Sequence, residues 1–129
     1  HPEQMPALER GMYFDADIPV DVMQKEVGNY IKITGASFGK DRQMSGEMTK
    51  MGVNKATGMQ RLMDELKIGR EDTIAFGDGP NDVEMLQFAG TGVAMGNAIP
   101  AVKQYADMVT DKIDEDGLYH AFERLHLLG

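Results

Sequence analysis

The sequence of 129 residues contains no cysteine, which excludes disulfide bonds, a thiolate zinc site and a thiol nucleophile. It has no apolar run of the roughly 18 to 20 residues that a membrane-spanning helix needs. It does not open with the basic and then apolar segment of a secretory signal, and it lacks internal repeats. These absences predict a soluble protein and are consistent with the reducing cytoplasm.

Basic residues are few, since 13 Lys and Arg stand against 21 Asp and Glu and the net charge is −8. A surface of this charge is unsuited to neutralising a phosphate backbone, so we expect neither nucleic acid nor a membrane as a partner. A chain of this length can bury one hydrophobic core but not two independent ones. The first residue is His1 rather than Met, and we therefore expect the natural start of the protein to lie upstream.

The first fifty residues predict a strand, a helix and two more strands. Residues 10–18 favour a strand, residues 19–28 a short helix, and residues 29–39 and 42–52 two strands with weak alternation. Pro19 suits the start of that helix, and Gly28 suits the position just beyond its end.

A second helix is predicted over residues 54–69, where the hydrophobic period changes. Asn54 is a good N-cap and Gly69 a good stop. The residues expected on its buried face are Met59, Leu62, Met63 and Leu66.

Strands and helices then alternate to the end of the chain. We expect strands over residues 72–78, 91–96 and 107–111, and helices over residues 81–90, 98–106 and 116–125. The last helix is expected to turn Leu118, Ala121, Phe122 and Leu125 inward. This alternation predicts βα units on a parallel sheet, and therefore an α/β fold.

The segment Gly-Asp-Gly-Pro-Asn-Asp at residues 77–82 interrupts this pattern directly after a predicted strand. Ligands of open parallel sheets bind beyond the carboxyl ends of the strands, which is where Asp78 lies. Gly77 and Gly79 allow a sharp turn and the close approach of a ligand. Asp82 follows in the next helical turn, and two converging carboxylates need a cation beside them. Hard oxygen ligands suit Mg²⁺, so Asp78 and Asp82 are predicted metal ligands.

Helix capping offers another explanation for part of this segment. Asn81 is a good N-cap, and Glu84 three residues later would nearly complete a capping box. An acidic first turn also suits the helix dipole. Capping explains Asn81 and Asp82 without a metal, but it does not explain Asp78 between two glycines.

Lys55 lies in the first turn of a predicted helix, where the dipole disfavours a cation. An anion held jointly by the ammonium group and the helix amides would compensate, and phosphate is the usual candidate. The alternative is a solvated lysine that swings away from the helix end.

Four segments occur in the order and spacing of a known family: GVNKATG at residues 52–58, GDGPNDVEML at 77–86, GVAMGNA at 92–98 and DEDGLYHAFERL at 114–125. Together they resemble the haloacid-dehalogenase (HAD) superfamily, and most closely its Cof-type phosphatases. The resemblance implies that residues 51–129 form the C-terminal half of a Rossmann-like core, and that residues 1–50 form the end of an α/β cap domain.

The resemblance also implies roles for individual residues. Lys55 would steady the transferring phosphoryl group, and Asn81 would contact the phosphate of the substrate. Asp78 would bind Mg²⁺ directly, and Asp82 would support the metal mostly through its water shell. The implied activity is Mg²⁺-dependent hydrolysis of small phosphorylated metabolites such as sugar phosphates.

The nucleophile motif of that family, D-x-D-G-T, is not present in the sequence. FDADIP imitates it at Asp15 and Asp17, but we interpret this segment as a cap strand. DEDGLY imitates it at Asp114 and Asp116, and we interpret it as the start of the final helix. The Ser or Thr of the family's second motif has no candidate either. We therefore expect a C-terminal fragment that is inactive by itself, and that either self-associates through exposed strand edges or is marginally stable.

Three other functions deserve comparison with this interpretation. P-type ATPases share the GDGxND motif, but they need membrane spans and D-K-T-G, which the sequence lacks. A Ser/His hydrolase has little support, because His120 and His126 follow no nucleophile elbow and are expected on the surface. A non-catalytic fragment that assembles with another chain remains the alternative.

Overall fold

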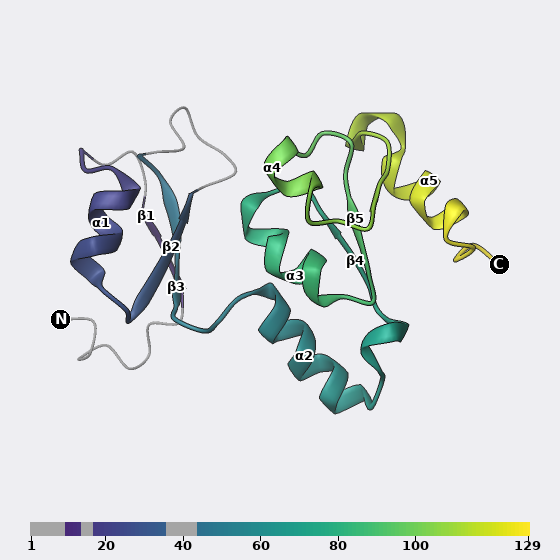
Figure 1. Ribbon diagram of the computed structural model, residues 1–129, viewed down its shortest axis with the longest axis horizontal. Coiled ribbons are helices and arrows are strands. Elements are labelled where there is room, and N and C mark those ends of the chain that lie inside the picture. The colour runs from purple at the N-terminus through teal and green to yellow at the C-terminus, as the bar shows by residue number, and fades with distance from the viewer. Residues whose placement is uncertain (1–9, 14–16, 36–43) are drawn as a thin grey trace. The chain divides into compact units, whose positions relative to one another are not determined.

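The computed structural model describes residues 10–13, 17–35 and 44–129. The chain divides into two compact units, His1–Val53 and Asn54–Gly129 (Figure 1). Within the described residues, every helix is too short or too polar to traverse a bilayer.

The described residues of the first unit form a small antiparallel sheet and a helix. Its elements are β1 (Arg10–Tyr13), α1 (Val20–Val27), β2 (Ile31–Gly35) and β3 (Gly46–Lys50), and the strand order is β1-β3-β2. Gln24 of α1 joins the helix to β2, because its side chain accepts a hydrogen bond from Ile33 N at 2.7 Å and donates one to Ile31 O at 2.9 Å. Helix α1 thereby hydrogen-bonds to the outer strand β2 of this sheet.

Helix α1 confirms its prediction, with Pro19 at the N-cap position and Gly28 beyond its end in a positive φ of 61°. The strands are shorter than predicted. Residues 14–16 and 36–43, which include Asp15 of the FDADIP segment, lie outside the described residues. Asp17 and Ile18 lie in a bend rather than a strand.

The second unit is a parallel sheet with helices. Its strands are β4 (Ile74–Gly77), β5 (Thr91–Ala94) and β6 (Met108–Val109). Its helices are α2 (Lys55–Leu66), α3 (Val83–Phe88), α4 (Pro100–Lys103) and α5 (Gly117–Arg124). Three 3₁₀ turns lie at Arg70–Asp72, Pro80–Asp82 and Ile113–Glu115. The strand order is β4-β5-β6 and both pairings are parallel, which confirms the predicted α/β class.

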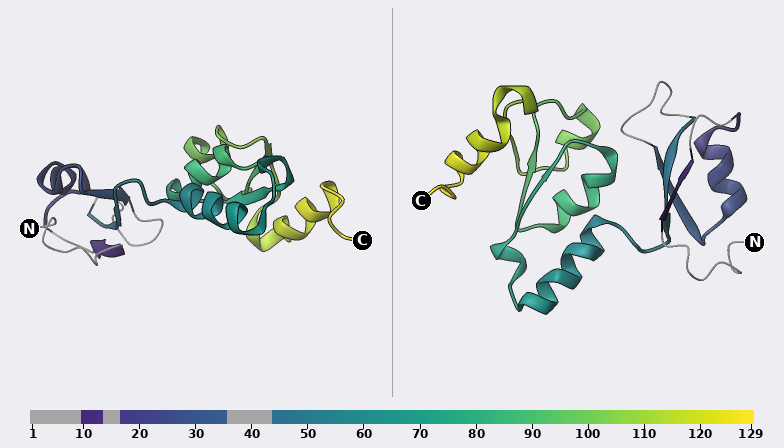
Figure 2. Two further views of the ribbon diagram at one scale, coloured as in Figure 1. Left: turned by 90° about the horizontal axis from the view of Figure 1, so that it is seen from below. Right: turned by 180° about the vertical axis from the view of Figure 1, so that it is seen from behind.

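Helices α3 and α4 lie on one side of this sheet and α5 lies on the other (Figure 2). The core between α3, α4 and the strands is built mainly from small residues: Ala75, Leu86, Ala89, Ala94, Ala98 and Val102. Gly92 of β5 also allows this close packing, because a Cβ atom there would lie 2.3 Å from the carbonyl oxygen of Leu86 in α3. Small side chains therefore bring α3 close to the strands that carry the loop at residues 77–82.

Three predictions about side chains and helix ends are wrong. Leu62 and Leu66 of α2 are 58% and 59% exposed, because this helix packs mainly against α3 and buries a narrow stripe around Met63. Leu118 of α5 is 44% exposed. Helix α2 ends at Leu66 rather than near Gly69, since Lys67 takes the left-handed conformation and donates its backbone N–H to Met63 O. The predicted N-cap Asn54 is confirmed by its capping box with Thr57.

Candidate active site

The loop after β4 is shaped by the close approach of Asp82 to Gly77. A Cβ atom on Gly77 would lie 2.5 Å from the Cβ of Asp82, so the site has no room for a side chain. Gly79 has an ordinary extended backbone with φ −108°. Neither glycine adopts a left-handed conformation. Gly77 is needed because a larger residue would collide with the side chain of Asp82.

Asp82 is the central acceptor of this loop and is only 4% exposed. Its Oδ2 accepts hydrogen bonds from the backbone N–H groups of Asp78 and Gly79, both at 3.0 Å. Its Oδ1 accepts a hydrogen bond from Lys55 Nζ, which makes an ion pair. Both oxygens of the carboxylate are thus engaged within the protein.

Lys55 is the first residue of α2, and its side chain is 49% exposed. The carboxylate of Asp82 supplies a negative charge beside this cation at the helix start. The lysine also does not swing away into solvent. Because the ion pair joins the start of α2 to the loop after β4, it fixes where the ammonium group lies.

Asn81 lies in the 3₁₀ turn Pro80–Asp82 and does not cap α3. Helix α3 begins at Val83, with Asp82 at the N-cap position and no capping hydrogen bond from that side chain. The capping interpretation of Asn81 is therefore wrong, because the 3₁₀ turn occupies the residues where the helix was expected to start.

A pocket of about 320 Å³ opens at the carboxyl end of β4. Its lining residues are Lys55, Phe76, Gly77, Asp78, Asp82, Met95, Asn97, Ile113 and Leu118. The structure thus brings three of the four predicted site residues to one pocket. Asn81 is not among the residues that line it.

Asn97 lines the same pocket and was not singled out from the sequence. Its Nδ2 donates to Asp78 Oδ2 at 2.9 Å. The register of the sheet explains this contact, because Gly77 at the end of β4 pairs with Ala94 at the end of β5. Polar residues that follow neighbouring parallel strands meet at one edge, and this rule could have identified Asn97.

The carboxylates that line this pocket are suited to binding Mg²⁺, with one of them as a direct ligand. In the described part of the chain, no three His, Cys, Asp or Glu side chains come together to hold a metal ion. Asp78 is exposed and offers a carboxylate, whereas both oxygens of Asp82 already accept hydrogen bonds. Mg²⁺ commonly binds through one or two carboxylates and keeps several waters. The donor set therefore suits direct contact by Asp78 and indirect support by Asp82.

Ion pairs and hydrogen bonds also order the segment that follows β6. Asp111 Oδ2 contacts both His120 Nδ1 at 3.0 Å and Arg124 at 2.8 Å, so α5 is tied to the end of β6. His120 lies at the surface with its side chain 42% exposed and is paired with Asp111, and His126 is exposed as expected. Beside the pocket, a hydrogen bond to Glu115 raises the pKa of Lys112.

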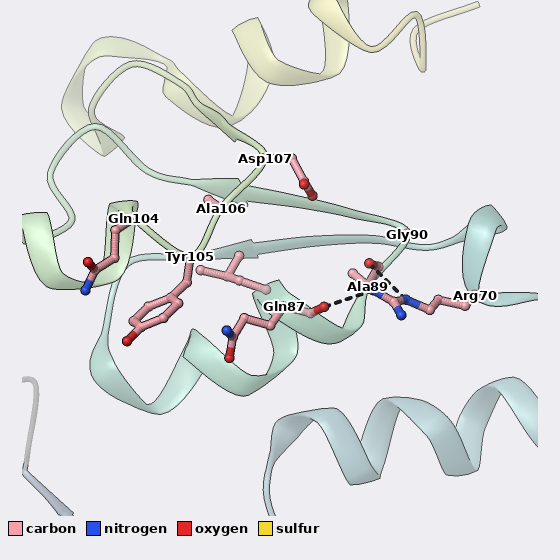
Figure 3. A pocket seen from close by; sticks show the side chains of 9 residues that line it. Arg70, Gln87, Ala89, Gly90, Gln104, Tyr105, Ala106 and Asp107 are labelled. Atoms are coloured by element: carbon pink, nitrogen blue, oxygen red, sulfur yellow. Dashed lines mark hydrogen bonds between the residues drawn. The ribbon is translucent and has the colours of Figure 1, made fainter.

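A second pocket, of about 370 Å³, lies at the amino ends of the strands (Figure 3). Its Arg70 donates to the carbonyl oxygens of Gln87 at 3.0 Å and Ala89 at 3.4 Å. A cation at the C-terminus of a helix offsets the helix dipole, so Arg70 caps α3. These contacts give the lining of this pocket a structural role.

Comparison with known proteins places the chain in a family. The haloacid dehalogenase-like hydrolase family matches residues 12–122. The phosphatase YwpJ of Bacillus subtilis is 34% identical over 132 residues, which cover 87% of this chain and 44% of YwpJ. The 5-amino-6-(5-phospho-D-ribitylamino)uracil phosphatase YitU of Bacillus subtilis is 56% identical over 72 residues, or 56% of this chain and 27% of YitU.

Solved structures give the same result. The HAD-superfamily phosphatase BT1666 from Bacteroides thetaiotaomicron matches 98% of this chain and 45% of its own, with a TM-score of 0.80 and 31% identity. The HAD sugar phosphatase BT4131 matches 93% of this chain and 44% of its own, with a TM-score of 0.78 and 29% identity. The chain thus spans less than half the length of each of these four relatives. It belongs to the haloacid dehalogenase-like hydrolases and, among them, to the Cof-type hydrolases.

Proposed function

We propose that this chain carries the metal-binding and phosphate-binding part of a Mg²⁺-dependent phosphatase that hydrolyses small phosphorylated metabolites such as sugar phosphates. The observation that carries the proposal is the pocket at the end of β4, where Lys55 and Asp78 lie together and Asp82 holds the lysine. Two relatives support this substrate class, since YitU is a 5-amino-6-(5-phospho-D-ribitylamino)uracil phosphatase and BT4131 is a sugar phosphatase.

The residues take distinct roles in this proposal. Asp78 is the direct metal ligand, and Asp82 supports the metal indirectly while it orients Lys55. The ammonium group of Lys55 steadies the phosphoryl group. Asn81 lies in the adjacent 3₁₀ turn outside the pocket lining, and its role of contacting the substrate phosphate rests on the family resemblance. Bound Mg²⁺ would supply neutralisation of the charge on the phosphoryl oxygens. Because the ion pair with Asp82 holds the ammonium group in advance, phosphate binding would require less ordering of that side chain.

The two units have separate roles in the proposal. We assign the first unit to the end of a cap domain and the second to half of the catalytic core, in a cytoplasmic enzyme. The sequence holds no D-x-D-G-T segment, so this chain alone lacks the nucleophile for phosphoryl transfer. We expect no hydrolysis of p-nitrophenyl phosphate by the chain alone. Hydrolysis that Asp78→Asn abolishes would contradict this expectation.

The test of the metal site is a titration of the chain with Mg²⁺ followed by NMR. We expect weak binding, with shifts of backbone amides centred on Asp78, because one carboxylate supplies only part of the oxygen shell. Asp78→Asn should abolish these shifts, and Asp64→Asn on the exposed face of α2 should leave them unchanged. Shifts that persist in Asp78→Asn would show that Mg²⁺ does not bind at this loop.

A non-catalytic module that assembles with another copy is the second candidate, and the edge of the sheet favours it. Among the described strands, β4 pairs only with β5, and an open strand edge invites pairing with another chain. We therefore expect self-association. Light scattering on a gel-filtration column at micromolar concentration should give the mass of a dimer or larger species, and a single monomer peak would rule this out.

A further inference from the structure

Asn97 makes two hydrogen bonds that link Asp78 to another loop of the pocket. Its Nδ2 donates to Asp78 Oδ2 at 2.9 Å, and its Oδ1 accepts from Ile113 N at 3.1 Å. A carboxylate can only accept and a backbone N–H can only donate, so these two partners fix the orientation of the amide.

The turn that carries Asn97 is held from three directions. Met95 N donates to Gly77 O at 2.9 Å, and Gly96 N donates to Asp111 O at 2.9 Å. The ammonium group of Lys103 donates to Gly96 O at 2.6 Å. A Cβ atom on Gly96 would lie 2.7 Å from the backbone of Asp111 and Lys112, so the turn is packed against that segment. The amide of Asn97 is thus presented from a fixed backbone.

The carboxylates of Asp78 and Asp82 differ in the number of hydrogen-bond donors that they contact. The carboxylate of Asp82 has Lys55 and two backbone N–H groups as partners. The carboxylate of Asp78 is exposed, and the described part of the chain gives it one hydrogen bond, from Asn97 to Oδ2. The other oxygen, Oδ1, remains for a ligand.

We propose that Asn97 is a positioning residue for Asp78, holding its Oδ2 so that Oδ1 is presented to a divalent cation in the pocket. The proposal rests on the proposed function, in which Asp78 is the metal ligand. An exposed aspartate otherwise rotates about χ1, and its ordering opposes metal binding. Hydrogen bonds from outside the coordination shell orient ligands in this way in other metal sites.

Two substitutions separate positioning of Asp78 from simple support of the loop. Asn97→Asp keeps an oxygen that can accept from Ile113 N, but at pH 7 it replaces the donor to Asp78 by a like charge. Asn97→Ala removes both hydrogen bonds. In each variant, three-bond NMR couplings without metal should show Asp78 changing from one χ1 rotamer to an average of several. The amide signal of Ile113 should shift in Asn97→Ala and change less in Asn97→Asp.

The control is Gln60→Ala, which removes an exposed amide on α2 that donates a hydrogen bond to Asp64 of the same helix. It should leave the Asp78 couplings unchanged. If Asp78 keeps one χ1 rotamer in both Asn97 variants, the positioning role is overturned, whatever the metal does.

A Mg²⁺ titration of the same proteins connects positioning to ligand binding. Asn97→Ala should weaken binding about tenfold relative to the unmodified chain. Unchanged affinity in this variant would overturn the proposal even if Asp78→Asn abolishes binding. If Asp78→Asn instead leaves Mg²⁺ binding unchanged, the proposed function fails, while the metal-free couplings still decide whether Asn97 positions Asp78.

Discussion

Replacing Asp82 by alanine is expected to lower the free energy of unfolding of the second unit by about 3 kcal/mol. The substitution leaves the N–H groups of Asp78 and Gly79 without their acceptor, and the hydrogen bond from Gly79 is buried. A buried donor without a partner costs about 1–3 kcal/mol. Loss of the ion pair with Lys55 lowers the free energy of unfolding only slightly further, because solvent screens the half-exposed lysine.

Urea unfolding followed through the NMR signals of β4 and β5 measures this change. Asp64→Ala is the matched control, since Asp64 is exposed on α2 and contacts Gln60 of the same helix. We expect the control to stay within about 0.5 kcal/mol of the unmodified chain. If Asp82→Ala is no more destabilising than Asp64→Ala, the carboxylate does not hold the loop.

Replacing Gly117 by alanine is expected to destabilise the second unit by about 3 kcal/mol or more. A Cβ atom at this position would lie 2.0 Å from the carbonyl oxygen of Asp111 and 2.7 Å from that of Lys112. Both contacts are to backbone, and Thr110 holds the same region through a buried hydrogen bond of 2.6 Å to Gly117 O. The loop therefore has to move as a whole to admit a methyl group.

Gly58→Ala is expected to stabilise the same unit, in contrast to Gly117→Ala. Gly58 lies inside α2, and a Cβ atom there would have no neighbour within 4 Å. Alanine in a helix is favoured over glycine by about 0.5–1 kcal/mol, so this variant should be more stable than the unmodified chain. Urea unfolding of the two variants checks the pair, and a Gly117→Ala protein as stable as Gly58→Ala would refute the crowding argument.

Much of the second unit is predictable because its signals are local. The change of hydrophobic period after Gly52, the N-cap Asn54 and the short apolar strands all act over a few residues, and they indicated α/β alternation correctly. The ends of helices were less predictable. Lys67 rather than Gly69 adopts the left-handed conformation after α2, and a 3₁₀ turn precedes α3 where Asn81 was expected to cap it. Tertiary packing selects among several acceptable stop and start positions.

The exposure of side chains also depends on which elements pack against a helix, and the hydrophobic periodicity of the sequence does not predict this. An apolar stripe on α2 predicted four buried residues, yet only Met63 among them is buried. The width of the covered stripe depends on which elements pack against the helix, and here that is mainly α3. Leu62 and Leu66 lie outside the contact for this reason.

The sequence alone determined which types of residue are available to the site. It also determined that these residues lie next to the end of a strand or the start of a helix. It indicated Lys55, Asp78 and Asp82, because glycines, a strand end and a helix start mark those positions locally. Only the tertiary structure decided that Lys55 pairs with Asp82 across 27 residues and that Asn97 contacts Asp78 across 19. The physical reason is that backbone propensity and burial act on neighbours in the chain, whereas the partner of a charged group depends on strand register and helix packing, which bring distant residues together.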